Sequence, residues 1–394
     1  MACLMGNGIA VRSDGPVCFE KLSRPKAPSF AMAASRRHKP RNAPPSFSPA
    51  VTDTTSTAAS PEFIAVFREH AGGGDTLSFA RFMELALYHE KTGYYSRPRL
   101  RIGRDPDADF FTSSSLGPVF GELVAAACAD LLAPQPPEAS VFVEIGTEPP
   151  GPGADAPPGV LASVAHPFAG ARNISLGQAL AIPPQAVVFS NELFDAQPCH
   201  RLVHRGGRWR ETGVALRSGV LEEVLLPEFS PEAAAAQGRL PPDAPEGYRI
   251  DLPLAASELA GRIAAPPWSG LFVAFDYGKT WRELSTETPA GTVRAYFRHQ
   301  QSNALLARPG EQDLTCHVCW DWIAETLAAH GFDTPVVESQ EAFFVHHAAP
   351  ALGRLTASEA GRFSRRKLDV MQLLHPGNMG RKFQVLHARR NRRA

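Results

Sequence analysis

Three short apolar runs in this sequence each end in residues that could take part in chemistry. The runs are VFVEI at 141–145, AVVFS at 186–190 and LFVAF at 271–275. The residues at their ends are Glu144 and Gly146, Asn191 and Glu192, and Asp276, Tyr277 and Gly278. Ligands of open α/β sheets bind beyond the carboxyl ends of the strands, so three such ends at one edge predict a binding site. The alternative is that they are ordinary turn residues.

The second of these ends, SNELFDAQP at 190–198, has the densest group of polar side chains. Fixed acceptors on Asn191, Glu192 and Asp195 could orient a substrate nitrogen, and we expect these three residues to be catalytic. If residues 192–195 begin a helical turn, both carboxylates lie on one side of it. Alternatively, Asp195 caps a following helix, or the segment is an Asx-type turn.

The first end reads VFVEIGTEPPGPG over 141–153 and is a candidate cofactor loop. A glycine after a strand lets a ligand approach the backbone closely. A loop of the E-x-G-x-G-x-G kind would have glycine at 148 and 150, where this chain has Glu148 and Pro150. Two glycines follow, Gly151 and Gly153. An acid that grips ribose hydroxyls is expected about 20 residues further on, but residues 160–176 contain neither Asp nor Glu.

The three runs do not alternate between apolar and polar residues, which is typical of strands covered by helices on both faces. We therefore predict an α/β fold with a doubly wound parallel sheet. Helices are predicted from Phe79, after the N-cap Ser78, and from Pro118. The stretch HRLVHRGGRWRETGVAL, starting at residue 200, predicts a β-hairpin in an inserted lobe at about 200–260.

Composition sets limits on the kind of protein. The 394 residues contain 40 basic and 40 acidic side chains, so nothing indicates a nucleic-acid partner. No apolar run is long enough to predict a membrane span. The six cysteines are too sparse for a disulfide scaffold, which favours a reducing compartment. Cys316 and Cys319 form a lone C-x-x-C that we interpret as structural thiols rather than a metal or redox site, and no metal site is expected.

Residues 1–60 differ from the rest of the chain, since they are rich in Pro, Ser, Ala and Thr and show no apolar periodicity. We predict a disordered segment here and an ordered domain over 61–394. A true translation start further along the chain, for example at Met32, would also explain this composition. We expect a cytoplasmic protein. The alternative is the mitochondrial matrix, because the segment has Arg and Ser but few acids, as transit peptides do.

Several motifs, in order, resemble those of the MidA family, class I S-adenosylmethionine-dependent methyltransferases that include the mitochondrial complex I assembly-factor methyltransferases. ALYHEKTGYYSRP at 86–98 resembles the family's "ALYHP…GYY", and ADFFTSSSLGPVFGELVA at 108–125 resembles "GDFxTSPxxxxxFGELL". VFVEIG is similar to the start of "ELGPGRGTL", SNELFDAQP to "NEFFDALP", and AFDYG to "xDYG". RHQQSNALLARPGEQDLTCHVCW at 298–320 resembles "H…PGxxDLTAHVDF". The resemblance covers roughly residues 62–390.

This resemblance implies a Rossmann-like seven-strand fold with N-terminal helices, binding S-adenosylmethionine, and a family in which at least one member acts on a protein arginine. It implies that Glu144 and Gly146 belong to the cofactor loop, to which we add Gly151 and Gly153 as cofactor-binding residues. It implies that Thr112 and Ser113 lie near the cofactor or the substrate, and we count them among the cofactor-binding residues. It places Asn191, Glu192 and Asp195 at the methyl acceptor, and it implies that Gly93, Tyr94 and Tyr95 close the substrate pocket.

Two functions remain open from the sequence. The first is a methyltransferase that acts on a protein arginine, whose planar guanidinium suits the Glu192 and Asp195 carboxylates. The second is a methyltransferase-fold binding or assembly factor with weak or no activity. The second is favoured by the changed loop, by the shorter segment between the loop and SNELFD, and by Ala108 in place of the family's glycine. The retained SNELFD and DLTCHV blocks favour the enzyme.

Overall fold

The computed structural model describes residues 58–96, 116–147, 159–175, 177–361 and 363–391. All of them belong to one unit of the chain, Thr55–Ala394. Among the predicted site residues, Thr112, Ser113, Gly151 and Gly153 lie outside the described residues, as does most of the predicted N-terminal segment.

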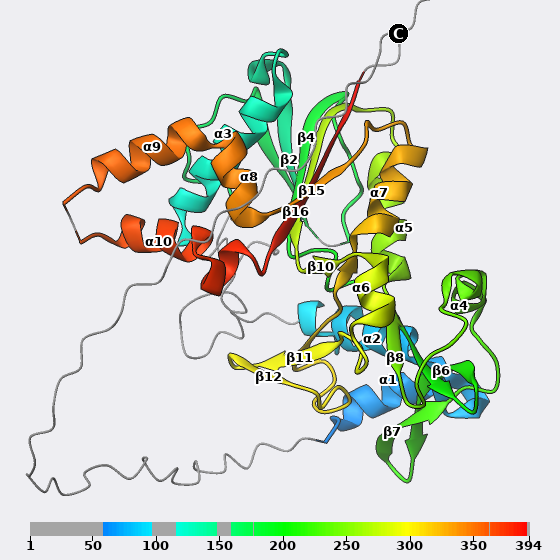
Figure 1. Ribbon diagram of the computed structural model, residues 1–394. Helices are drawn as coiled ribbons and strands as arrows, with labels where there is room; N and C mark the ends of the chain where they lie inside the picture. The colour runs from blue at the N-terminus through cyan, green and yellow to red at the C-terminus, as the bar shows by residue number, and fades with distance from the viewer. Residues whose placement is uncertain (1–57, 97–115, 148–158, 176, 362, 392–394) are drawn as a thin grey trace, which may run out of the picture. The chain divides into compact units, whose positions relative to one another are not determined.

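The centre of this unit is a six-stranded sheet (Figure 1). Its strands, in spatial order, are β15 (Val336–Ser339), β16 (Gln384–Arg390), β9 (Ser269–Asp276), β4 (Gln185–Asn191), β2 (Val141–Thr147) and β3 (Gly170–Ser175). The four strands from β9 to β3 are parallel, and β16 and β15 are antiparallel to their neighbours. The three buried strands and their parallel pairing are confirmed.

Both faces of this sheet are covered, as the continuous apolar runs predict. Along β4, Val187 and Phe189 point into one core cluster, and Ala186 and Val188 point into the other. This alternation is the two-residue period of a strand. One cluster lies under α3 (Pro118–Leu132), α8 (Gln340–His347), α9 (Ala349–Ser358) and α10 (Arg365–Leu374). The other lies under α5 (Leu254–Ala264) and α7 (Trp320–Ala329).

The sheet has six strands within the described residues, where the resemblance implied seven. The segment 176–184 is all that links β3 to β4. A crossover with its own helix and strand needs about a dozen residues or more. The chain is therefore too short at this point for the additional unit, which agrees with the shortening noted in the sequence.

A second, antiparallel sheet builds the predicted lobe. It has the order β1 (Thr76–Ser78), β6 (Arg208–Arg217), β5 (His200–Arg205) and β8 (Arg249–Leu252), with β7 (Val220–Leu225) paired to β6. The predicted hairpin is β5–β6, and both residues of its turn, Gly206 and Gly207, have positive φ angles. The lobe is not an insertion alone, because β1, from the N-terminal part, is one of its strands.

The N-terminal helices pack against this sheet. They are α1 (Pro61–Ala71) and α2 (Phe79–Tyr88), and Ser78 caps α2 as predicted by accepting a hydrogen bond from the Arg81 amide. Their apolar side chains share a core with Val214 and Leu216 of β6. The remaining elements are α4 (Pro231–Ala235), α6 (Trp281–Thr286), β10 (Gly278–Lys279), β11 (Arg294–Phe297), β12 (Gln300–Ser302), β13 (Asp313–Thr315) and β14 (Val318–Cys319), with short turns η1 (Gly72–Gly74), η2 (Tyr94–Ser96), η4 (Pro137–Ala139), η5 (Gln237–Arg239) and η6 (Pro376–Gly380).

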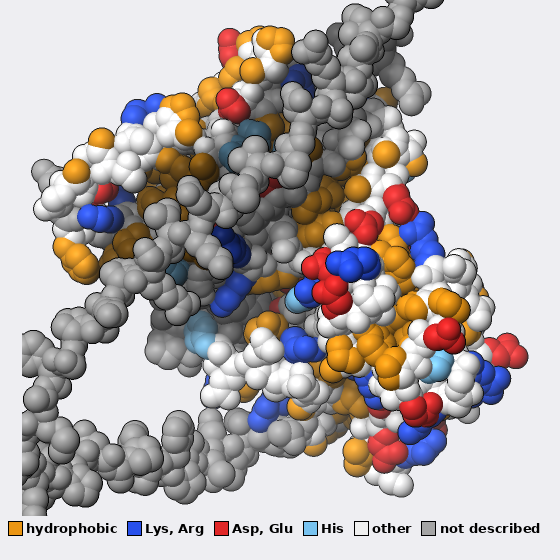
Figure 2. Space-filling model, viewed as in Figure 1, with side chains coloured by type: hydrophobic (Ala, Val, Ile, Leu, Met, Phe, Trp, Pro, Cys, Tyr) orange, Lys and Arg blue, Asp and Glu red, His pale blue; other side chains and the backbone are white. Residues whose placement is uncertain are grey.

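The helices of the described residues and the face drawn in Figure 2 bear on possible partners. None of the described helices is both long enough and apolar enough to cross a membrane. On the face drawn in Figure 2, acidic and basic side chains lie next to one another around α6 and α7. This mixture agrees with the zero formal net charge of the chain.

Candidate functional site

The register of the parallel sheet brings the three predicted strand ends together. Ile145, Ser190 and Ala274 stand side by side across β2, β4 and β9. Gly146 follows the first of these residues, Asn191 the second, and Asp276 comes shortly after the third. The polar strand ends of the sequence therefore meet at one edge of the sheet.

The segment after β4 is a tight turn rather than a helix. Glu192 has a positive φ of 51°, and its amide donates to the Phe275 carbonyl at 2.9 Å. The Gln197 amide donates to the Phe194 carbonyl at 3.2 Å, and the next element is strand β5. The expectation of a helical turn over 192–195 is wrong, and so is the alternative that Asp195 caps a helix.

The carboxylate of Asp276 fixes this turn. Its Oδ2 accepts hydrogen bonds from the Phe194 amide at 2.9 Å and the Asp195 amide at 3.2 Å, and its Oδ1 accepts one from the Tyr277 amide at 2.8 Å. Asp276 is completely buried, and burial raises its pKa to about 7 against the opposing effect of these hydrogen bonds. The sequence indicated Asp276 as a strand end but gave no hint of this role.

Asp195 lies buried among other acids. Burial raises its pKa well above the usual range, and the charges of Asp276, Glu192 and Asp313 raise it further. The Asn191 side-chain amide donates to Glu192 Oε1 at 2.9 Å. Asn191, Glu192 and Asp195, which the sequence singled out, thus lie in one acidic group, together with Asp276 and Asp313, which it did not assign.

Tyrosines from three parts of the chain surround these acids. The Tyr95 hydroxyl donates to Asp313 Oδ1 at 3.1 Å, and its ring stacks on Tyr88 at 5.4 Å between centroids. The pKa values of Tyr88, Tyr95, Tyr277 and Tyr296 are all raised, first by burial and then by neighbouring charges that include Asp195. We call this group the acidic–tyrosine cluster: Asn191, Glu192, Asp195, Asp276, Asp313, Tyr88, Tyr95, Tyr277 and Tyr296.

The three residues expected to close the pocket have different places. Tyr95 reaches the acidic–tyrosine cluster through Asp313. Tyr94 is fully buried in the core of the N-terminal helices. Gly93 follows α2 in a tight turn, where a Cβ atom would lie 2.5 Å from the His89 backbone nitrogen. Tyr94 and Gly93 therefore shape the lobe, and only Tyr95 extends to the acids.

Contacts within the chain hold the start of the candidate cofactor loop in place. Glu144 is buried, and its Oε2 accepts a hydrogen bond from the Val160 amide at 2.6 Å. Burial raises the pKa of Glu144 to about 7 despite this hydrogen bond. Gly146 has a φ of 87°, and a Cβ there would lie 2.7 Å from Leu193 Cδ1. Backbone conformation and contact with Leu193 thus already account for the glycine.

The end of β3, where a ribose-binding acid was expected, has hydroxyl groups instead. Thr147 Oγ1 and Ser175 Oγ are hydrogen-bonded at 3.1 Å, and the Ser175 amide donates to Gln178 Oε1 at 2.9 Å. At the end of β4, in contrast, Ser190 Oγ and Asn191 Oδ1 are buried and have no hydrogen-bond partner in the described structure. Buried polar atoms are rarely left without a partner, so these two acceptors fit a bound ligand with N–H or O–H donors.

The DLTCHV block forms the wall beside the acids. The Cys316 amide donates to the Asp195 carbonyl at 2.8 Å, and the Val318 amide donates to the Tyr277 carbonyl at 2.8 Å. Cys316 and Cys319 are buried free thiols, and α7 begins directly after Cys319. Their position agrees with a structural role at a helix start.

Comparisons with known proteins identify the fold. A family model described as "Putative S-adenosyl-L-methionine-dependent methyltransferase" matches residues 171–337. A crystal structure from Burkholderia thailandensis with S-adenosyl-homocysteine bound is similar over 86% of this chain and 96% of its own, with 24% identity and a TM-score of 0.71. The chain has a Rossmann-like methyltransferase fold. A native structure of an uncharacterized protein from the same bacterium matches with 23% identity and a TM-score of 0.67, over 86% of this chain and 96% of that one. No curated protein matches the chain.

The segment that the family model matches includes part of the candidate site. It contains Asn191, Glu192, Asp195, Asp276 and Asp313, but it begins after Glu144 and Gly146. The match agrees with the methyltransferase class and the S-adenosylmethionine cofactor predicted from the sequence. None of these three matches identifies the methyl acceptor or singles out the MidA family.

Proposed function

We propose that this protein transfers a methyl group from S-adenosylmethionine to an arginine side chain of a protein, as a member of the MidA family. The observation that supports this best is the acidic–tyrosine cluster at the carboxyl ends of β4 and β9. Ligands of open α/β sheets bind at such an edge. Burial raises the pKa of Asp195, and repulsion from the neighbouring acids raises it further. A bound cation would relieve that repulsion.

A guanidinium fits this cluster better than an ammonium ion does. It is planar and always charged, and it can donate several N–H groups to carboxylates in fixed directions. We assign Glu192 and Asp195 to hold it and Asn191 to orient Glu192 through their 2.9 Å hydrogen bond. Tyr95 and Tyr88 would border the site, since their rings stack beside Asp313 and Asp195.

The cofactor supplies a methyl group on a sulfonium, and the chain's own residues do the rest. Ser190 Oγ and Asn191 Oδ1 are the acceptors available to the cofactor or to the guanidinium. Forming the new N–CH₃ bond breaks the S–CH₃ bond and releases one N–H proton from the guanidinium. Asp195 is the group we assign to accept this proton, because its carboxylate is one of the two that would hold the guanidinium.

A second function, a binding or assembly factor with little activity, is favoured by two specific observations. The β3 end has Ser175 and Gln178 where an acid would grip the ribose. Glu144, next to the loop, is already satisfied by the Val160 amide. Both features would weaken cofactor binding without affecting the fold.

Ligand binding separates the two functions. We expect S-adenosyl-homocysteine to bind with a micromolar dissociation constant, about −8 kcal/mol. At about 100 times that constant it should stabilise the protein by roughly 2.7 kcal/mol. Calorimetric titration and thermal unfolding measure both. If millimolar ligand gives neither heat nor a thermal shift, the enzyme proposal fails and the assembly-factor proposal remains.

The Glu192→Gln variant tests the acceptor site. It should keep cofactor binding and lose roughly 100-fold in turnover, as removal of one charge-orienting group often does. Glu222→Gln, on the exposed edge of β7, is the matched control and should leave turnover unchanged. Mass spectrometry of partner proteins from cells with and without the gene identifies the acceptor. Methyl groups that appear only on lysine or glutamine would refute the arginine assignment.

A further inference from the structure

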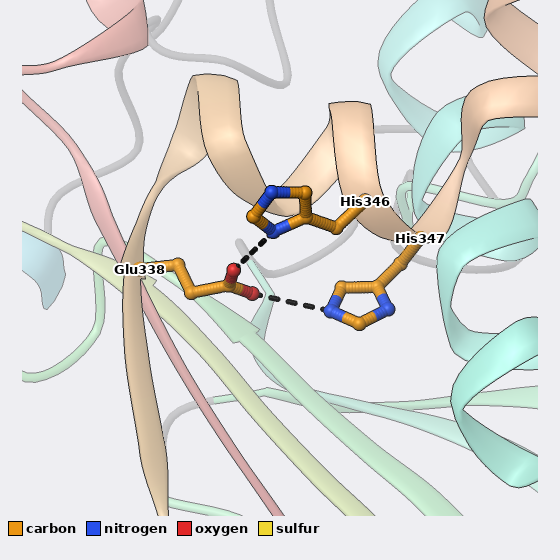
Figure 3. A group of neighbouring side chains, drawn as sticks. All are labelled: Glu338, His346 and His347. Carbon is orange, nitrogen blue, oxygen red and sulfur yellow. Dashed lines mark hydrogen bonds and ion pairs between the residues drawn. The ribbon is translucent and has the colours of Figure 1, made fainter. Parts of the chain in front are cut away.

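A second group of titratable side chains lies at β15, an edge strand of the central sheet. Glu338 of β15 faces His346 and His347 of α8 (Figure 3). Glu338 Oε1 is 2.5 Å from His346 Nδ1, and Glu338 Oε2 is 3.1 Å from His347 Nε2. We call these three residues the histidine–glutamate cluster.

A third imidazole borders this cluster. His387 of β16 has its Nε2 atom 3.3 Å from Glu338 Oε2. The register of β15 and β16 explains this, because Val336 is opposite His387 and Glu338 is two residues further along. Side chains two positions apart across an antiparallel pair lie on the same face. The sheet and the helix above it therefore bring three imidazoles to one carboxylate.

This set of donors is the one that zinc prefers. Zinc in proteins is bound by imidazole nitrogens and carboxylate oxygens at about 2.0–2.2 Å, mostly in tetrahedral sites. Such bonds place neighbouring ligand atoms about 3.3 Å apart. The distance from Glu338 Oε2 to His347 Nε2, 3.1 Å, is close to this value. The ligand atoms of Glu338, His346 and His347 all lie within 4.8 Å of one another.

The surroundings hold one of these ligands in the form that binds metal. His347 Nδ1 lies 3.3 Å from Asp130 Oδ2, while its Nε2 faces Glu338. A carboxylate on the far nitrogen of a histidine is the usual support of a zinc ligand, since it fixes the tautomer and the ring orientation. Asp130 comes from α3, so the support is independent of β15 and α8.

We propose that Glu338, His346 and His347 bind a zinc ion, with Asp130 as the positioning group for His347. The ion would tie α8 to the β15–β16 edge of the sheet. The sequence gave no reason to expect this site, because its ligands have none of the spacings of known zinc motifs. The other interpretation is a hydrogen-bonded network without metal, in which a protonated histidine pairs with Glu338.

The experiment uses the full chain, treated with chelator and then titrated with zinc chloride. We expect one zinc ion per chain at this site with a micromolar or lower dissociation constant, and a rise in melting temperature. Magnesium should have no such effect, since it prefers oxygen ligands. No zinc binding, or the same shift with magnesium, would overturn the proposal.

Substitutions at the proposed site test where the zinc ion binds. His346→Ala should weaken zinc binding roughly 10-fold or more, and folding should be unaffected because the His346 side chain is 58% exposed. Asp130→Asn should weaken binding about 10-fold with unchanged stoichiometry, as loss of a supporting carboxylate does. His70→Ala removes an exposed histidine from α1 and is the matched control. If His346→Ala binds zinc as tightly as His70→Ala, the site lies elsewhere and the assignment is wrong. These measurements do not depend on methyl transfer.

Discussion

The carboxylate of Asp276 fixes the backbone of the proposed acceptor site. The amides of Phe194 and Asp195 both donate to Asp276, which holds Asp195 against the end of β9. Local sequence patterns describe contacts a few residues apart, whereas these two hydrogen bonds span 82 and 81 residues. The acidic segment was therefore recognisable from its composition, but its shape was not.

At Gly146, the structure gives a different explanation for the glycine from the one that the sequence suggested. The sequence assigned it to the close approach of a ligand. In the structure, a side chain at this position would clash with Leu193 and strain a positive φ. Gly146→Val would therefore disturb the protein itself, and it cannot serve as a clean test of cofactor binding.

Glu144 leads to a prediction about pH. Burial raises its pKa from 4.5 to about 7, so the folded protein holds a proton that the unfolded chain releases. The stability that this proton gives is complete below about pH 4.5 and is lost as the pH rises through about 7. At about 1.4 kcal/mol for each pKa unit, the loss is roughly 3 kcal/mol. Glu144→Gln keeps an acceptor for the Val160 amide and should abolish this loss.

Urea unfolding at pH 5 and pH 8 measures this difference. Between the two values, the wild type should lose roughly 3 kcal/mol more than Glu144→Gln. Glu258→Gln, on the exposed side of α5, should follow the wild-type profile. Parallel profiles for the wild type and Glu144→Gln would show that Glu144 is not the titrating group.

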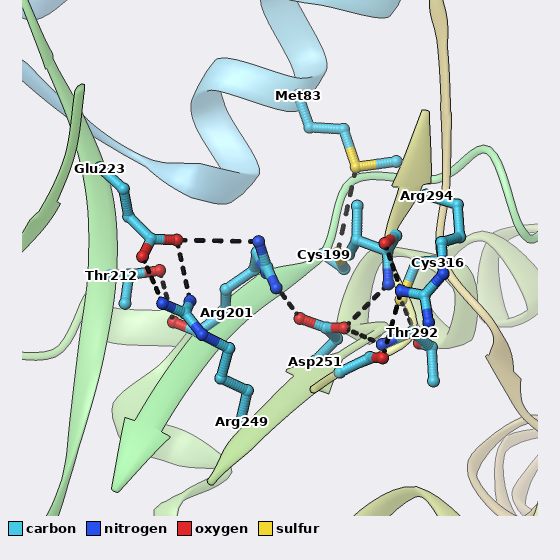
Figure 4. A network of polar contacts seen from close by, with 12 residues as sticks. Met83, Cys199, Arg201, Thr212, Glu223, Arg249, Asp251, Thr292, Arg294 and Cys316 are labelled. Atoms are coloured by element: carbon cyan, nitrogen blue, oxygen red, sulfur yellow. Dashed lines mark hydrogen bonds and ion pairs between the residues drawn. The ribbon is translucent and has the colours of Figure 1, made fainter. Parts of the chain in front are cut away.

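At the scale of elements, a buried ion pair joins the lobe to the chain after α6. Arg201 of β5 donates from Nε to Asp251 Oδ1 of β8 at 2.8 Å, and both side chains are buried (Figure 4). Asp251 Oδ2 accepts hydrogen bonds from the Thr292 and Val293 amides. One carboxylate thus connects two strands of the lobe and the segment that leads into β11.

We predict that Asp251→Ala destabilises the protein by about 3–5 kcal/mol. The substitution leaves the Arg201 guanidinium buried beside two unsatisfied backbone amides. Glu222→Gln is the control, because its partner Arg217 is exposed and such pairs contribute about 1 kcal/mol or less. Urea unfolding of both variants gives the comparison. A loss with Asp251→Ala no larger than that with Glu222→Gln would show that the buried pair does not stabilise the lobe.

At the scale of the whole molecule, the sequence was most informative where structure depends on local pattern. The continuous apolar runs of β2, β4 and β9 predicted covered parallel strands, and Gly206 and Gly207 predicted the β5–β6 hairpin. Pairing between distant segments was not predictable. β1 joins β6 across more than 100 residues, because the strand Thr76–Ser78 has too few residues for a pattern of its own. The contact between His387 and Glu338 depends on such distant pairing too, because it follows from the pairing of β15 with β16.

The last prediction concerns the N-terminal segment. Its composition cannot bury enough apolar surface to offset the entropy of ordering the chain, so deleting residues 1–55 should leave the free energy of unfolding unchanged. The cut leaves Ser60, whose Oγ accepts a hydrogen bond from the Phe63 amide at the start of α1. Ser60→Ala removes this cap and should cost about 1 kcal/mol, which gives a scale for the comparison. Urea unfolding measures both. If the deletion costs as much as Ser60→Ala or more, the segment docks on the domain, and the boundary near residue 60 is wrong.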